Sequence, residues 1–235
     1  MGSLSYDTSQ VVTKTTAGII ILPREHYLVK RKDRTDQSKH RIGKSACDQC
    51  TYCTEFCPRY LLGYNVQPHK VMRSLVFTKT GTEVWNQFAE LCCACGLCTL
   101  YACPEDLYPK EACDWSKIAM REQGIKYVQT HPVEVHPVKE GRRVPLKQLI
   151  RRLNLQDYNV HTPFKVEKPK TDNVKIYLKQ HVGEKATPVV QTGDYVKAGQ
   201  LIAEPAKGKL GARIHASIEG IVTDISGDFV KIITK

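Results

Sequence analysis

The apolar residues follow a helical period through the middle of the chain. Between residues 68 and 153 they recur at three- and four-residue spacing in four segments, the pattern of helices with one buried face. A proline opens two of these segments, Thr82 can cap another, and a glycine follows two of them. The predicted helices are residues 68–80, 83–91, 110–123 and 145–153.

The apolar pattern changes to strand-like alternation in residues 173–235, as in the run that starts at Val174. We therefore expect a small all-β domain at this end of the sequence. Residues 192–197 recur in similar form at 226–231, each time around a Gly-Asp pair. This internal echo suggests two related hairpin-like halves.

Two further stretches lie outside these regions. Residues 10–22 are rich in β-branched side chains and predict one or two strands, and residues 30–44 hold seven basic and two acidic side chains. The expected architecture is therefore α+β. It consists of a β-rich N-terminal segment with a basic linker, a helical domain, a Pro- and Lys-containing linker and an all-β domain, at residues 1–45, 46–154, 155–172 and 173–235 respectively.

All ten cysteines lie between Cys47 and Cys113. A clustered set favours metal ligands in a reducing compartment over disulfides that close long loops. The first run, residues 47–58, has the spacing C-x2-C-x2-C-x3-C-P, which is that of bacterial ferredoxins with a [4Fe-4S] cluster. The second run, residues 92–104, repeats this spacing with one additional residue before its final Cys-Pro.

In two-cluster ferredoxins the fourth cysteine of each run binds the other cluster. The spacing therefore predicts two [4Fe-4S] clusters with crossed ligand sets. The additional residue in the second run leaves the crossing role of its last cysteine open. Zinc is the alternative metal, but paired C-x2-C knuckles usually have a longer gap between them. The first predicted set is Cys47, Cys50, Cys53 and Cys103, and the second is Cys92, Cys95, Cys98 and Cys57.

Cys93 and Cys113 fall outside both ligand sets and are predicted to be small buried apolar residues, because free cysteine is commonly buried. The eight histidines show no ligand spacing and are predicted to be ordinary residues. No catalytic residue is predicted in this sequence.

The formal net charge of +11 is not accompanied by a recognisable nucleic-acid-reading module, so no nucleic-acid partner is expected. We expect the basic residues to form a shell around anionic clusters that guides an acidic partner. The longest aliphatic run, residues 19–22, is too short to span a bilayer and follows no secretory leader, so neither a membrane span nor secretion is expected. Neither a dinucleotide-binding nor a phosphate-loop glycine motif is present.

Residues 91–105, together with the first cysteine run, resemble the cobalamin reductases of propanediol-utilisation microcompartments. Residues 180–183, 193–200 and 214–217 are similar to the barrel-sandwich domain that this family shares with the C subunit of the Rnf electron-transport complex. In the Rnf subunit that domain is N-terminal and precedes the flavin- and NADH-binding region, whereas here it follows the cysteine runs, as in the cobalamin reductases. The resemblance covers residues 11–235.

The resemblance implies a helical double-[4Fe-4S] ferredoxin domain followed by a small barrel-sandwich hybrid domain. It also implies that electrons pass from NADH through flavin and the clusters to a corrinoid. The family's N-terminal flavin- and NADH-binding region has no counterpart in this sequence. FMN and NADH are therefore expected through a flavoprotein subunit or another domain, and cobalamin is expected as the substrate.

The other expected partners are a corrinoid enzyme, an adenosyltransferase and the microcompartment shell. The expected location is the cytoplasm, inside a bacterial microcompartment. This chain would supply the electron-transfer part of an NADH-dependent reductase. Two alternatives stay open at this point, namely a scaffold or docking subunit whose clusters are structural, and an Rnf-type electron-transport subunit.

Overall fold

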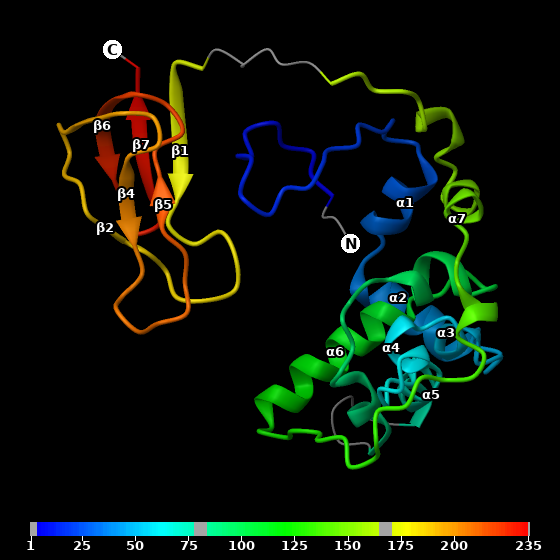
Figure 1. Cartoon of the computed structure of the whole chain (residues 1–235). Helices are drawn as coiled ribbons and strands as arrows, with labels where there is room; N and C mark the ends of the chain where they lie inside the picture. The colour runs from blue at the N-terminus through cyan, green and yellow to red at the C-terminus, as the bar shows by residue number, and fades with distance from the viewer. Residues whose placement is uncertain (1–3, 78–83, 165–170, 235) are drawn as a thin grey trace. The chain divides into compact units, whose positions relative to one another are not determined.

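The computed structural model describes residues 4–77, 84–164 and 171–234, which divide into a helical unit and a β unit (Figure 1). The helical unit is Leu22–His161 with Met1–Leu4, and the β unit is Ser5–Ile21 with Thr162–Lys235. The helical unit contains α1 (Tyr27–Asp33), α2 (Asp36–Ser45), α3 (Tyr52–Glu55), α4 (Pro58–Leu61), α5 (Pro68–Phe77) and α6 (Pro109–Glu122), then α7 (Leu146–Arg152). Its other turns are η1 (Val84–Ala89), η2 (Cys98–Ala102), η3 (Glu140–Arg142) and η4 (Gln156–Tyr158).

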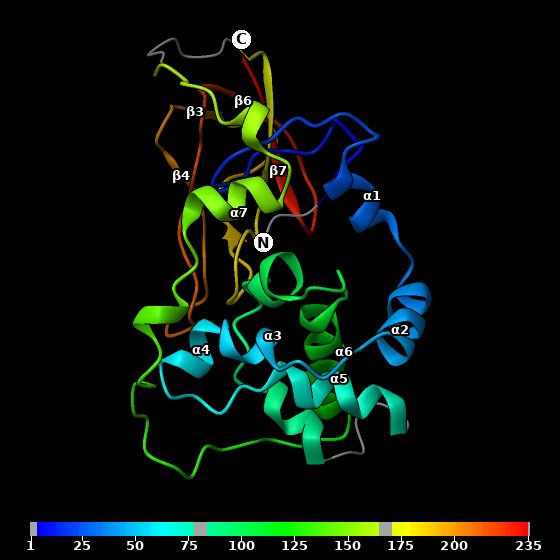
Figure 2. The same cartoon turned by 90° about the vertical axis from the view of Figure 1, so that its right-hand side faces the viewer.

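The core of the helical unit forms where α5 and α6 pack together with η1 (Figure 2). Helix α2 packs on α5 at Gly43, where a Cβ atom would come within 3.2 Å of Met72 Cε. The small residue therefore permits a close approach of these two helices. The buried side chains of this core are Val71, Met72, Leu75, Ala89, Cys103, Leu107, Ala112, Cys113 and Met120.

Three of the four predicted helices are confirmed as α5, α6 and α7. The predicted helix at 83–91 is instead the short 3₁₀ helix η1, and its predicted cap, Thr82, lies outside the described residues. Gly124 has a φ of +68° and follows α6, as expected of a residue that ends a helix.

The sequence did not predict helices α1 and α2, which occupy most of the stretch interpreted as a basic linker. Both have a side-chain cap that accepts a backbone N–H: His26 accepts from Leu28 N, and Thr35 accepts from Ser38 N. The high charge of this stretch concealed its few inward-facing positions. Arg31 is one of them, with an exposed fraction of only 6%.

The β unit is built from two antiparallel sheets, with strand orders β1-β7-β6-β3 and β2-β4-β5. The predicted alternation is present: in β7, Val230 and Ile232 are buried and their neighbours are only partly so. Inward-facing side chains of both sheets form one apolar core. The strands are β1 (Asn173–Tyr177), β2 (Thr187–Pro188), β3 (Tyr195–Val196), β4 (Leu201–Glu204), β5 (Ile214–His215), β6 (Gly220–Ile225) and β7 (Phe229–Ile233).

The two copies of the internal echo lie in the same sheet, because β3 and β7 pair with opposite edges of β6. Each copy makes a turn that a side chain closes. Asp194 Oδ2 accepts from Gln191 N at 2.7 Å, and Ser226 Oγ accepts from Asp228 N at 3.1 Å. The two copies of the repeated sequence therefore each form a turn that leads into a strand of the same sheet, β3 or β7.

The strands predicted at residues 10–22 do not form. This segment belongs mainly to the β unit, where Lys14 N donates to Gln180 Oε1 at 2.8 Å and Lys14 Nζ donates to Arg213 O at 2.7 Å. Such bonds involve side chains and fix the segment at single points, whereas a strand needs a continuous backbone ladder. The β-branched composition alone did not supply that partner.

Candidate metal centres

The two cysteine loops adopt the same backbone conformation. Gln49 and Thr51 in the first loop have φ angles of 58° and 67°, and Ala94 and Gly96 in the second have 54° and 79°. These residues stand two and four positions after the first cysteine of each run. Non-glycine residues seldom adopt positive φ. Its recurrence at matching positions curls both loops in the same way and lets the thiols of each run face a common centre.

The last cysteine of each run also has a matching conformation. Cys57 has φ −72° and ψ 118° and precedes the first residue of α4; Cys103 has φ −75° and ψ 117°. The additional residue of the second run is taken up by the single π turn η2, in which Cys103 N donates to Cys98 O at 3.2 Å. A π turn accommodates one extra residue without displacing the residues after it. The insertion therefore leaves Cys103 in the position equivalent to Cys57.

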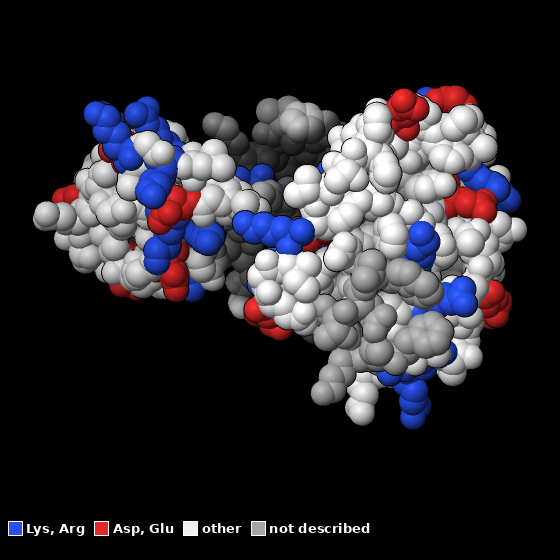
Figure 3. All heavy atoms as spheres, turned by 90° about the horizontal axis from the view of Figure 1, so that it is seen from below, with Lys and Arg blue, Asp and Glu red and all other residues white. Residues whose placement is uncertain are grey.

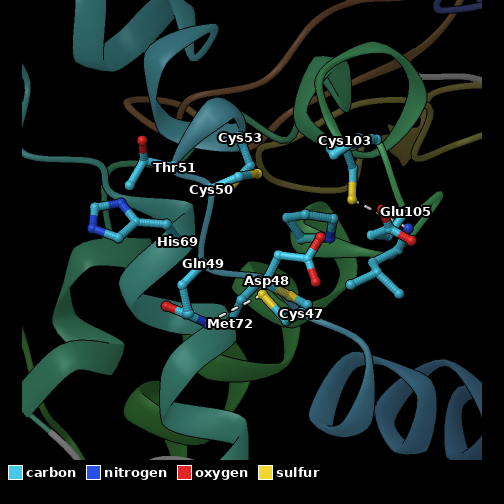
Figure 4. A pocket seen from close by; sticks show the side chains of 13 residues that line it. Cys47, Asp48, Gln49, Cys50, Thr51, Cys53, His69, Met72, Cys103 and Glu105 are labelled. Carbon is cyan, nitrogen blue, oxygen red and sulfur yellow. Dashed lines mark hydrogen bonds between the residues drawn. The ribbon is translucent and has the colours of Figure 1, made fainter.

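One pocket brings together the four cysteines predicted as the first ligand set, as Figure 4 shows. The thiols of Cys47, Cys50 and Cys53 come from the first loop, and Cys103 reaches the same pocket from the end of the second run. Gln49 Nε2 donates to Cys47 Sγ at 3.1 Å, and the Leu107 N–H donates to Cys103 Sγ at 3.3 Å. Among the described residues, no group of three or more His, Cys, Asp and Glu could hold a single metal ion.

The structure also brings the second predicted set together. Besides burial, the charges of Cys92 and Cys95 raise the pKa of Cys57. The pKa of Cys98 is likewise raised by burial and by the charges of Cys57, Cys92 and Cys95. Cys53 of the first set is a further electrostatic neighbour of Cys98, so the two sets are adjacent.

Burial controls the ionisation of most of these thiols. It raises the pKa of Cys57 to about 11 and raises the pKa values of Cys53 and Cys98 as well. The same cause raises the pKa values of Cys47, Cys95 and Cys103. Iron binds the thiolate form of cysteine. Because burial makes these thiols resist ionisation, a cationic core is needed to compensate the buried negative charge. All ten cysteines are free of disulfides, and this donor set fits iron–sulfur clusters.

Cys92 differs from the other thiols in the direction of its shift. A hydrogen bond from the Cys113 side chain lowers the pKa of Cys92 to about 6, and the Ala94 N–H and the Lys117 ammonium act in the same direction. Ala94 N lies 3.3 Å from Cys92 Sγ, and Lys117 Nζ donates to Cys92 O at 2.9 Å. The surroundings of Cys92 therefore favour its thiolate, in contrast to the buried thiols whose pKa values are raised.

The two remaining cysteines have different environments. Cys113 is fully buried on α6, as predicted, whereas Cys93 is exposed and corrects the prediction that both would be buried. Cys93 lies within the loop between two predicted ligands. A loop that turns the thiols at 92 and 95 inward leaves the intervening side chain directed toward solvent.

A pair of arginines fixes the segment that carries Cys103, and the sequence did not single out either of them. Arg31 Nη2 donates to Thr99 O at 2.8 Å and to Leu107 O at 2.7 Å. Arg152 Nη2 donates to Cys103 O at 2.9 Å and to Asp106 Oδ1 at 2.8 Å. These bonds connect α1 and α7 to the second cysteine run. No spacing rule relates such distant positions, so only the fold could identify them.

His69 was predicted to be an ordinary residue but lines the pocket of the first set. Its Nδ1 lies 2.7 Å from the hydroxyl of Thr54, which is buried next to Cys53. Burial is the main cause that lowers the pKa of His69. The imidazole therefore packs beside this pocket in a desolvated environment.

The expectation of a basic shell is not met at this pocket. Its lining includes Asp48 and Glu105, and no described Lys or Arg contributes to it (Figure 4). On the face of the molecule that Figure 3 shows, Lys and Arg alternate with Asp and Glu and do not form one continuous patch. Some of the positive charge also lies inside the fold, as at Arg31.

No helix in the described ranges is both long and apolar enough to cross a membrane.

Comparison with known proteins supports a two-part composition. Residues 46–108 match the 4Fe-4S dicluster domain family, and residues 159–232 match the RnfC barrel sandwich hybrid domain family. The first match includes all eight predicted ligands. The chain is an iron–sulfur protein. Its α+β architecture, with a double-cluster ferredoxin domain followed by a barrel-sandwich domain, agrees with the sequence-based prediction.

The iron–sulfur protein is similar over nearly its whole length to two curated relatives. It is 33% identical to cobalamin reductase PduS of Salmonella typhimurium over 234 residues and 33% identical to that of Citrobacter freundii over 233 residues. These matches cover 99% of this chain and 51% of each relative, so the chain spans about half of their length. A shorter match, 44% identical over 72 residues, is to the C subunit of the proton-translocating ferredoxin:NAD(+) oxidoreductase complex of Clostridium ljungdahlii. It covers 31% of this chain and 15% of that relative.

Proposed function

We propose that this chain relays single electrons through two [4Fe-4S] clusters with crossed ligand sets. The observation that carries the proposal is the pocket shared by Cys103 and the first cysteine loop. The matching conformations of Cys57 and Cys103 support the reciprocal crossing. In this assignment Cys47, Cys50, Cys53 and Cys103 hold one cluster, and Cys92, Cys95, Cys98 and Cys57 hold the other.

When bound, each cluster would accept and release one electron with little change in geometry, because the charge spreads over several irons. The protein contributes the thiolates, their burial and the hydrogen bonds to sulfur. Among the described bonds, Gln49 and the Leu107 N–H act on the first set, and Ala94 N acts on the second. Adjacent sets, with Cys53 near Cys98, favour transfer between the two centres over a short path.

The physiological role that we propose is the electron-transfer part of a cobalamin reductase located in a propanediol-utilisation microcompartment of the cytoplasm. Its support is the similarity to proteins named cobalamin reductase along nearly the whole chain. Electrons would enter from NADH through an FMN-containing domain or subunit and leave to a corrinoid. An adenosyltransferase, a corrinoid enzyme and the shell are the other partners that this role implies.

A second candidate role is an Rnf-type subunit, supported by the match to the C subunit of the Clostridium ljungdahlii complex. In that role the chain would exchange electrons with a redox partner of a membrane complex. The two roles differ in the acceptor of the electrons and in whether the chain co-purifies with membrane components.

The test is anaerobic reconstitution of the full chain followed by electron transfer. We expect about eight irons and eight sulfides per chain, bleaching by dithionite, and oxidation of the reduced, desalted protein by a corrinoid. Bleaching followed by transfer only to a membrane-derived partner would favour the Rnf-type role. A cluster-loaded chain that transfers electrons to neither, nor to an artificial acceptor, would contradict the relay and favour a structural scaffold.

A further inference from the structure

A side-chain amide contacts the sulfur of the first cysteine in the first loop. Gln49 Nε2 donates to Cys47 Sγ at 3.1 Å, as the dashed line in Figure 4 shows. Gln49 also lines the pocket that holds the first predicted ligand set. Both residues are partly buried, so protein atoms exclude part of the water that would otherwise solvate this sulfur. The amide is therefore placed to act on a predicted ligand without being a ligand itself.

The equivalent position of the second loop carries Ala94. Gln49 and Ala94 each stand two residues after the first cysteine of their run, and their φ angles are 58° and 54°. The Ala94 side chain is a methyl group and has no donor. Its backbone N–H lies 3.3 Å from Cys92 Sγ, so a main-chain group acts on the first cysteine of the second run. Because the backbone is matched, the two positions can be compared by exchanging side chains.

We propose that Gln49 is a positioning residue that raises the reduction potential of the first cluster through its hydrogen bond to Cys47 Sγ. The inference rests on the proposed ligand assignment. A donor to a ligand sulfur withdraws electron density from it and stabilises the reduced, more negative state of the cluster. The step concerned is the uptake of one electron by the cluster. The amide is uncharged, so it neither binds nor releases a proton in that step.

The experiment compares the full chain with its Gln49→Leu and Gln49→Glu variants after anaerobic reconstitution. The readouts are iron content and a redox titration followed by electron paramagnetic resonance. Cys95→Ser, which lacks a predicted ligand of the second set, identifies the midpoint that belongs to the first cluster. Leucine is similar in size to glutamine and is not β-branched, so the backbone preference of this position stays nearly the same.

We expect both variants to hold as much iron as the wild-type chain. At a fixed solution potential, Gln49→Leu should lower the ratio of reduced to oxidised first cluster by roughly threefold, the size expected for one partly exposed hydrogen bond. Gln49→Glu should lower the ratio further, because its carboxylate cannot donate and adds a negative charge beside the sulfur. The second cluster should titrate as in the wild-type chain in both variants.

The matched control adds the missing donor to the second loop. Ala94→Gln should raise the ratio of reduced to oxidised second cluster and leave the first cluster unchanged, because the backbone at this position matches that of Gln49. Ala94→Leu places a side chain of similar size there without a donor and should not raise that ratio. An equal increase in Ala94→Leu would contradict the inference, because the donor would then not be its cause.

An unchanged first midpoint in iron-loaded Gln49→Leu would overturn the inference. Equal shifts of both midpoints in that variant would also overturn it, because the change would then not act through Cys47. If leucine disturbs the loop and iron is lost, Gln49→Glu decides the test, since it keeps the length and polarity of the side chain. A reconstituted wild-type chain with no clusters would contradict the proposed function instead, so the two failures are distinguishable.

Discussion

The two cysteine loops share a conformation but are built from different residues. The first loop places Gln49 and Thr51 at its two positions of positive φ, and the second places Ala94 and Gly96 there. Their surroundings also differ. The Gln49 amide donates to Cys47 Sγ in the first loop, whereas Lys117 of α6 donates to Cys92 O in the second. The comparison shows that the spacing of the thiols fixes the backbone path, whereas the neighbouring chain determines the environment of each sulfur.

The largest predicted effect comes from removing one predicted ligand from each loop. Cys50→Ser and Cys95→Ser should each lose about half of the bound iron, because each variant removes a member of a different set. Iron and sulfide analysis after anaerobic reconstitution measures the loss. Unchanged iron in either variant would contradict the ligand assignment of that loop. Electron paramagnetic resonance should show that the two variants retain different clusters.

The support of the second run is tested at Arg31. Arg31→Met removes two hydrogen bonds to the backbone and leaves their carbonyl oxygens without a donor inside the fold. We expect a loss of about 3 kcal/mol in the free energy of unfolding. Chemical denaturation of the loaded chain, followed by circular dichroism, measures this loss. Lys32→Met is the control, because Lys32 is an exposed cation on the same helix and should change stability by less than about 0.5 kcal/mol.

The smallest predicted effects concern the positions of positive φ in the second loop. Ala94→Gly should stabilise the loaded chain by up to about 1 kcal/mol, because glycine adopts the left-handed conformation without strain. Gly96→Ala should destabilise it by about 1 kcal/mol for the same reason. Paired denaturation curves of the two variants provide the measurement. Shifts of the same sign would show that the φ angles do not control the stability of this loop.

The sequence predicted the metal chemistry of this chain better than the scaffold that supports it. The spacing pattern of two-cluster ferredoxins grouped Cys103 with the first loop, although the additional residue left that role open. The same pattern could not show how the additional residue before Cys103 is accommodated. That required the π turn, whose defining bond from Cys103 N to Cys98 O is visible only in the folded chain.

The basic N-terminal stretch illustrates where sequence reasoning failed. Its high charge indicated a solvated linker, but α1 and α2 form there and bury Arg31. The burial depends on acceptors far away in the sequence, Thr99 O and Leu107 O. Residues 10–22 show the opposite error, since β-branched side chains predicted strands for which no sheet edge is provided. In both cases the outcome depended on a distant partner, and no local pattern reports such a partner.

The crossing of the ligand sets is the central claim, and Cys103→Ser tests it most directly. The reconstituted variant is compared by electron paramagnetic resonance with Cys50→Ser and Cys95→Ser. The account predicts that Cys103→Ser loses or alters the same cluster signal as Cys50→Ser and keeps the signal that Cys95→Ser loses. If Cys103→Ser instead matches Cys95→Ser, each run holds its own cluster and the crossed assignment is contradicted.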